Sequence, residues 1–255
     1  MNGMNAASRQ ILGALAAYVI VSGFAGPGPS NATEPPQRSA SPVTTSDVRA
    51  KSVRLPAVAE AVGSRVAVRS APKVNARRIA TMKAIRFDFR RTVFFVTTRI
   101  VRGNGGWYRV KVPGRPNGRS GWVPERQLRL LRSAGPLRIV IDRSRRQLVL
   151  KRGEKTVMDA PVAVGKSGAP TPLGRFYVTA KFAPSNDFLG PWAFELSAYA
   201  AITDWPRGGI VGLHGTSEPW SIGSRASSGC IRTYNWVIRG LRRKIRDGTV
   251  VRIKA

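Results

Sequence analysis

The chain has 255 residues, 42% of them hydrophobic and 8% aromatic, which is enough to build one large or two modest folded domains. Its 43 Lys and Arg outnumber its 13 Asp and Glu, and the formal net charge is +30 at pH 7, so its surface attracts polyanions. A zinc site uses three or four His, Cys or carboxylate ligands, and this chain has one His and one Cys. Composition therefore argues against a metal centre.

Residues 11–24, ILGALAAYVIVSGF, form an apolar run that follows Arg9 and precedes small residues and prolines. This pattern predicts a signal peptide or membrane anchor over residues 1–32, although the run is shorter than the about 20 residues of a membrane-spanning helix. Both alternatives export the rest of the chain to the periplasm, cell wall or extracellular space. There the basic surface meets anionic wall polymers, so no nucleic-acid partner is expected. Residues 33–57, rich in Pro, Ser and Thr, predict a linker.

Residues 58–133 contain short runs of alternating apolar and polar residues, separated by Gly, Pro and Asn about every ten residues. That pattern is typical of a small β-barrel or sandwich. The stretch GWYRV at Trp107 and the stretch GWV at Trp122 resemble bacterial SH3 modules of exported wall enzymes. Each tryptophan is interpreted as a packing residue, with stacking on a peptide or sugar as the alternative.

Residues 134–255 begin with alternating segments that predict two or three strands, with a tight turn at residues 151–154. A Gly- and Pro-rich loop is expected at residues 164–179, where Pro170 and Pro172 exclude the helix that a phosphate-binding loop requires. Residues 209–214 predict a buried strand ending at His214. Thr233 is a candidate N-cap for a helix over about 234–246, and residues 249–253 predict a closing strand.

The only histidine, His214, and the only cysteine, Cys230, are separated by a loop that is rich in Gly and Ser and contains one Pro and one Trp. One thiol and one imidazole together support nucleophilic catalysis, in which the thiolate attacks an acyl carbon and the imidazole moves the proton. Gly229 lets the backbone approach the reacting carbonyl, and we expect amides near Gly229 and Cys230 to stabilise an oxyanion. A following helix and the nearby Arg232 predict a stabilised thiolate.

The motifs HGT at His214 and SSGCIR at Ser227, with the upstream VGKSGAPTPLGRFYV and the closing DGTVVRI, resemble the catalytic domain of L,D-transpeptidases, which cross-link peptidoglycan. The resemblance implies an all-β fold with one or two short helices, in which a small SH3-like barrel over 58–133 precedes a β-sandwich-like catalytic domain over 134–255. It also implies that Cys230 is the nucleophile, that His214 is the base and acid, and that the Gly215 carbonyl orients the imidazole.

The same resemblance implies that Arg232 binds a substrate carboxylate or braces the pocket. We further expect Thr216, Trp220, Ser227 and Ser228 to contribute to substrate binding. Ser228 stands where many members of the family carry a second histidine, which leaves His214 as the residue to assign as the base.

The reaction that the resemblance implies has two steps and needs no cofactor. Cys230 attacks the third-residue carbonyl of a donor tetrapeptide stem and D-alanine leaves, after which an amine of an acceptor stem takes the acyl group, giving a 3→3 cross-link. Acylation of the thiol by carbapenems is a further expectation. The alternatives are an L,D-carboxypeptidase or wall-peptide hydrolase using the same site, and a non-catalytic basic wall-binding protein with Cys230 as a packing residue. The oligomeric state is left open.

Overall fold

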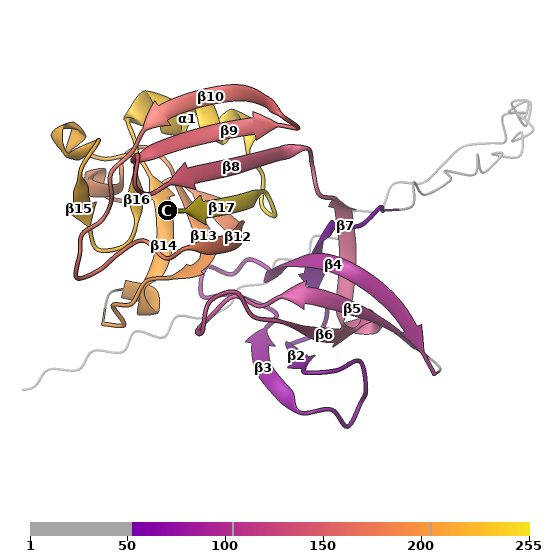
Figure 1. Ribbon diagram of the computed structural model, residues 1–255. Coiled ribbons are helices and arrows are strands. Elements are labelled where there is room, and N and C mark those ends of the chain that lie inside the picture. Colours follow the sequence, from indigo (N-terminus) through magenta and orange to yellow (C-terminus); the bar gives the residue numbers. More distant parts are fainter. Residues whose placement is uncertain (1–52, 104, 205) are drawn as a thin grey trace, which may run out of the picture. The chain divides into compact units, whose positions relative to one another are not determined.

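The structure, a computed structural model, describes residues 53–103, 105–204 and 206–255 of the chain. The signal peptide or membrane anchor expected for residues 1–32, and the expected linker as far as residue 52, lie outside the described residues. The described residues belong to one compact unit that contains two hydrophobic cores, each associated with its own β-sheet (Figure 1).

The first sheet has seven strands in the order β3-β2-β6-β5-β4-β1-β7, and all its neighbouring pairs are antiparallel. Alternate residues of a strand face opposite sides of the sheet, and this places the apolar side chains in the core. In β2, Val66 and Val68 point inward, while Arg65 is exposed. Trp107 is also buried, which favours packing over ligand stacking for this residue. The strands are β1 Ala57–Ala61, β2 Arg65–Arg69, β3 Arg78–Lys83, β4 Val93–Arg102, β5 Gly105–Lys111, β6 Ser120–Pro124 and β7 Leu128–Ser133, with a 3-10 turn η1 at Glu125–Gln127.

The first core extends further towards the N-terminus than the predicted start at residue 58. Val53 and Leu55 pack against it, and Ala57 is fully buried at the start of β1. The final residues of the expected linker therefore pack with the first core, because burial removes their apolar side chains from water.

The second sheet has eight strands in the order β10-β9-β8-β17-β12-β13-β14-β16. Leu148 and Leu150 of β9 share one core with Leu213 of β14 and Ile231 of β16, from near opposite ends of that order, so the sheet curls around the core. The strands are β8 Leu137–Asp142, β9 Gln147–Arg152, β10 Lys155–Pro161, β12 Gly174–Phe182, β13 Ala193–Tyr199, β14 Ile210–His214, β16 Ile231–Arg232 and β17 Val250–Lys254. A separate parallel pair joins β11 Val164–Gly165 to β15 Arg225–Ser227.

Helices are few among the described residues, and the expected fold class, mainly β with short helices, is confirmed. One α-helix, α1, spans Asn235–Lys244 and buries the apolar side chains of Val237, Ile238 and Leu241. Full burial of each such side chain stabilises the folded state by roughly 1.5–3 kcal/mol. The short 3-10 helices are η1, η2 Asp187–Leu189, η3 Pro206–Gly208 and η4 Pro219–Ser221.

Both predicted ends of α1 need correction. Thr233 is not the N-cap: its N–H donates to the His214 carbonyl (2.9 Å), which commits its backbone to the sheet, and the helix starts two residues later. The C-terminal end comes at Lys244 rather than 246, because Ile245 adopts an extended backbone and buries its side chain. No helix in the described part of the chain has the length and apolar character needed to cross a membrane.

Candidate active site

Sheet pairing brings the single histidine and the single cysteine to one pocket. His214 ends β14, and β14 pairs in parallel with β16, which begins directly after Cys230. Both residues line a pocket of about 280 Å³. The lone His and Cys are therefore held by adjacent strands rather than by a loose loop.

Gly212 lies between the two reactive side chains. On a strand, residues two apart face the same side, so Gly212 shares the face of His214 while Val211 and Leu213 enter the core. The Gly212 N–H donates to the Cys230 Sγ (3.3 Å). A Cβ atom at this position would lie 3.4 Å from His214 Cδ2 and 3.7 Å from Cys230 Sγ. A glycine thus keeps the space between imidazole and thiol open.

The His214 imidazole is fixed in one tautomer. Its Nδ1 lies 2.5 Å from the Gly215 carbonyl oxygen. Because a carbonyl only accepts, Nδ1 carries the proton and Nε2 keeps its lone pair for a substrate or thiol proton. The side chain is 2% exposed, and this burial lowers the pKa of His214 to about 4; the hydrogen bond to Gly215 opposes the shift, and the Arg232 charge adds to it.

The Cys230 thiol does not have the stabilised thiolate expected from the sequence. Burial raises its pKa above the usual range, and the Gly212 N–H and the Arg232 charge only partly oppose this. The expected helix contribution fails because Cys230 precedes a short strand, and α1 begins only at Asn235. In the free protein the pair is therefore a neutral thiol beside a neutral imidazole.

A single histidine makes this charge state directly measurable. The imidazole proton resonances should show no titration between about pH 5.5 and 8 and should shift only as the pH approaches about 4. Unfolded His214 binds a proton below pH 6.5 and the folded residue does not, so the free energy of unfolding should fall by up to about 3 kcal/mol from pH 7 to pH 4. An NMR titration with a midpoint near 6.5 would contradict the buried neutral imidazole.

The residues after His214 form a close-packed support behind the pocket. The Asn235 Oδ1, at the start of α1, accepts the Thr216 N–H (2.9 Å). A Cβ on Gly215 would lie 2.3 Å from that oxygen, so only glycine fits there. Thr216 is 3% exposed, and its Oγ1 accepts the Glu218 N–H. The structure thus makes the Gly215 carbonyl the hydrogen-bond acceptor for the imidazole, and it places Thr216 in the buried segment that supports the pocket.

Ser227 and Gly229 shape the backbone that carries the thiol. The buried Ser227 hydroxyl donates to the Cys230 carbonyl (2.5 Å) and accepts the Gly229 N–H (3.2 Å). Gly229 has φ +115°, and a Cβ there would lie 2.7 Å from the Ala200 Cβ. Because the Gly229 N–H is already bonded, it is not free to bind an oxyanion. Ser228, between them, is half-buried.

Arg232 is buried and is not among the residues that line the pocket. It is 8% exposed, its Nη1 pairs with the Glu218 carboxylate, and its guanidinium stacks 5.0 Å from the centroid of the Phe188 ring. The ring of Phe188 also lies 6.5 Å from the His214 ring. Arg232 was expected either to bind a substrate carboxylate or to brace the pocket, and these contacts fit the bracing role. Trp220, on η4, is 78% exposed and is not among the pocket-lining residues.

Several residues of the site were missed from the sequence. Gly212 had a usable signal, because it lies two residues before His214 on the same predicted strand. Glu195 on β13 and Arg207 in η3 also line the pocket, and Glu218 and Asn235 support it. Nothing in their sequence spacing indicates these positions. Within the described ranges, no three His, Cys, Asp or Glu residues cluster closely enough to hold a metal ion.

The part of the chain that carries this site is similar in sequence to known proteins. The family model described as "L,D-transpeptidase catalytic domain" matches residues 136–253. The chain is 30% identical over 118 residues to "Putative L,D-transpeptidase YkuD" of Bacillus subtilis (strain 168), covering 46% of this chain and 66% of that protein, just under two thirds of its length. It is 30% identical over 128 residues to "Putative L,D-transpeptidase YqjB" of the same strain, covering 45% of this chain and 69% of that protein.

A structure of an L,D-transpeptidase from Mycobacterium smegmatis is also similar to this chain. It shares 14% sequence identity, with coverage of 64% of this chain and 99% of the other, at a TM-score of 0.42.

Proposed function

The chain belongs to the L,D-transpeptidase family, and we propose that it is an acyltransferase that cross-links peptidoglycan stem peptides through Cys230. The observation that carries this proposal is the shared pocket, in which the thiol and the free Nε2 of an oriented, neutral imidazole lie on adjacent strands. That arrangement is what acyl transfer by a cysteine nucleophile requires.

In the first half-reaction, the Cys230 sulfur bonds to the third-residue carbonyl carbon of a donor tetrapeptide. Because the thiol is neutral at rest, His214 Nε2 takes its proton as the bond forms, and then gives the proton to the amine of the departing D-alanine. In the second half-reaction, an amine of an acceptor stem loses its proton to His214 and attacks the thioester, which releases the thiolate. The product is the cross-linked pair of stems.

The developing oxyanion needs donors beside Cys230. The Gly229 N–H is occupied by Ser227, so we assign the Cys230 N–H as the main candidate. The Gly212 N–H, which contacts Sγ in the resting state, stabilises the thiolate when it is released. Gly215, Thr216, Ser227 and Arg232 then act by holding this geometry, while Ser228 and Trp220 remain candidates for substrate contact.

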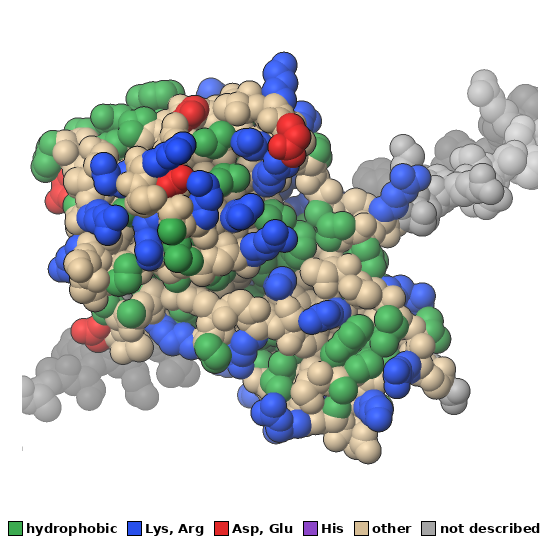
Figure 2. Space-filling view, in the orientation of Figure 1, with side chains coloured by type: hydrophobic (Ala, Val, Ile, Leu, Met, Phe, Trp, Pro, Cys, Tyr) green, Lys and Arg blue, Asp and Glu red, His purple; other side chains and the backbone are tan. Residues whose placement is uncertain are grey.

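We also propose that the protein acts outside the cytoplasm, exported by residues 1–32, where its substrate is found. The seven-stranded N-terminal sheet is proposed to be SH3-like on the basis of the GWYRV and GWV stretches. One face of the second sheet carries a groove lined by six cations and two acids, which suits anionic wall polymers (Figure 2). The cations are Arg138, Arg145, Lys151, Arg175, Arg252 and Lys254.

Incubation of the protein with a disaccharide tetrapeptide tests the activity directly. Mass analysis should show a dimer that has lost one D-alanine. A disaccharide tripeptide incubated alone serves as the matched control and should give no dimer, because it lacks the residue whose departure accompanies acylation. Conversion to monomeric tripeptide alone would instead indicate a carboxypeptidase, and unchanged tetrapeptide would support the non-catalytic wall-binding alternative.

A further inference from the structure

Arg207 lines the pocket and its side chain is accessible to solvent. It lines the same pocket as His214 and Cys230, and its side chain is 43% exposed. Arg232, the arginine expected from the sequence to meet a carboxylate, is 8% exposed and paired with Glu218. Of these two guanidinium groups, only that of Arg207 is open to a ligand in the pocket.

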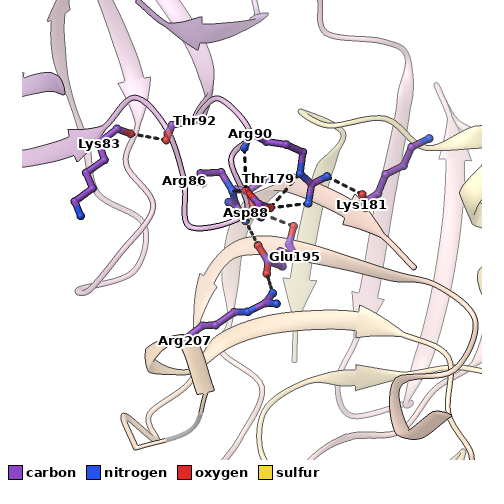
Figure 3. A network of polar contacts seen from close by, with 9 residues as sticks. All are labelled: Lys83, Arg86, Asp88, Arg90, Thr92, Thr179, Lys181, Glu195 and Arg207. Carbon is purple, nitrogen blue, oxygen red and sulfur yellow. Dashed lines mark hydrogen bonds and ion pairs between the residues drawn. The ribbon is translucent and has the colours of Figure 1, made fainter. Parts of the chain in front are cut away.

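The network of ion pairs that includes Arg207 carries a net positive charge. Its Nη1 donates to Glu195, and Glu195 is also bound by Arg86 from the segment between β3 and β4 (Figure 3). Asp88 pairs with Arg86 and Arg90 on the far side of this network. Three arginines thus share two carboxylates, a net charge of +1. Among the described residues, Arg207 Nε and Nη2 make no hydrogen bond, so the paired donors that suit a carboxylate are free.

The N-terminal sheet fixes the segment that carries Arg207. Arg115, between β5 and β6, donates to the carbonyls of Ala200 (2.5 Å), Ile202 (3.0 Å) and Gly208 (2.7 Å). The Asn117 side chain bonds both the N–H and the carbonyl of Tyr199. Both ends of the segment are therefore tied to one loop of the other sheet.

The backbone and stacking contacts of Arg207 also restrict it. Its φ is +64°, a conformation that a residue with a side chain adopts only when its surroundings impose it. Its guanidinium stacks 4.4 Å from the centroid of the Phe87 ring and 5.4 Å from that of Phe182. These contacts orient the guanidinium before any ligand arrives, which reduces the cost of binding.

We infer that Arg207 binds a carboxylate of the stem peptide beside Cys230, and that Arg86 is a positioning residue that acts through Glu195. The inference rests on the proposed function for the identity of the ligand, but the binding of a carboxylate near the thiol does not. Two such groups flank the bond that Cys230 would attack, the carboxylate of the terminal D-alanine and a side-chain carboxylate on the third residue where one is present. The N-terminal sheet thereby completes the active site.

Two thiol reagents of similar size test this without a natural substrate. Iodoacetate carries a carboxylate and iodoacetamide does not, and with each the Cys230 sulfur bonds to the methylene carbon while iodide leaves and the thiol proton is lost. Arg207 should attract iodoacetate but not the neutral iodoacetamide. The ratio of the iodoacetate rate to the iodoacetamide rate should therefore be higher in the wild type than in a variant without the Arg207 charge. We expect Arg207→Gln to lower this ratio about fivefold, and Arg207→Lys to retain part of it.

Arg243→Gln is the matched control, because it removes the same charge from the exposed end of α1. It should leave the ratio unchanged, because Arg243 does not line the pocket and an exposed charge is screened by salt. An unchanged ratio in Arg207→Gln, with a normal iodoacetamide rate, overturns the inference. A normal iodoacetamide rate also shows that the variant keeps its site intact.

Arg86→Gln tests the positioning role. With Arg86 gone, Glu195 is neutralised by Arg207 alone and the net charge falls, so the ratio should drop while the iodoacetamide rate stays constant. Arg86→Lys should restore it in part. A merely structural role would instead lower both alkylation rates in parallel, and that result would contradict the assignment of Arg86.

Amidated stems separate the two sources of the carboxylate. A tetrapeptide amidated at its C-terminus and one amidated at the third-residue side chain are each compared with the free acid. The amide that blocks the true ligand should raise the KM of the wild type about fivefold and leave the KM of Arg207→Gln unchanged. Equal KM values for all three substrates would contradict carboxylate binding. Absence of any transfer would sink the proposed function, while the alkylation ratio would still decide the role of Arg207.

Discussion

Cross-linking of stem peptides is expected to fall by at least about 10³-fold when Cys230 is replaced by serine, because a hydroxyl at this position lacks the nucleophilicity of the thiol. The serine Oγ can accept the same Gly212 N–H that the sulfur accepts, so the variant should fold and melt within a few degrees of the wild type. The loss would then report on chemistry rather than stability.

Intact-protein mass spectrometry gives this prediction a second readout. After incubation with a carbapenem, the wild type should carry one adduct, and Cys230→Ala should carry none. If the wild type remained unmodified and inactive, Cys230 would be a packing residue and the protein a wall-binding module. Retained cross-linking in the serine variant would place the nucleophile elsewhere.

Replacing His214 by glutamine should lower kcat by about 10²- to 10⁴-fold, the usual contribution of a general base. The amide is neutral and similar in size to the imidazole, but it lacks the proton-accepting lone pair that His214 keeps on Nε2. With no base, alkylation of Cys230 by iodoacetamide should follow the thiolate fraction and rise with pH up to the raised pKa of the thiol.

The pH profile of the wild type tests the same assignment. Burial lowers the pKa of His214 to about 4, so the acid limb of kcat/KM should lie near pH 4 rather than 6.5. An acid limb near 6.5 would contradict a neutral buried base, and an unchanged kcat in His214→Gln would remove His214 from the mechanism. Arg243→Gln, which changes only an exposed charge on α1, should retain the profile of the wild type.

The sequence predicted those parts of the molecule that follow from local patterns. Alternation predicts β8 and β9 with Ile139, Ile141, Leu148 and Leu150 inside, and all four are fully buried. Periodicity likewise predicts α1 and its buried face. The proposed catalytic pair could be assigned from the sequence because the chain has one His and one Cys, and the structure places both in one pocket.

The parts that were missed depend on contacts between distant segments. Arg86 and Glu195 are 109 residues apart in sequence, and no local pattern pairs them. Arg207 could not be chosen among 43 cationic residues without the pocket. The error in the charge state of Cys230 has a similar origin, because adjacency to Arg232 and a nearby helix suggested stabilisation, whereas burial in the folded site is the larger effect.

The neutral resting thiol has a consequence for the durability of the protein. Peroxides and disulfides react with thiolates, so a partly buried Cys230 with a raised pKa oxidises slowly. The chain has no second cysteine, so an oxidised Cys230 has no resolving partner within the molecule. If Cys230 is the nucleophile that we propose, a thiol that stays protonated at rest protects the one sulfur atom whose oxidation the protein cannot reverse by itself.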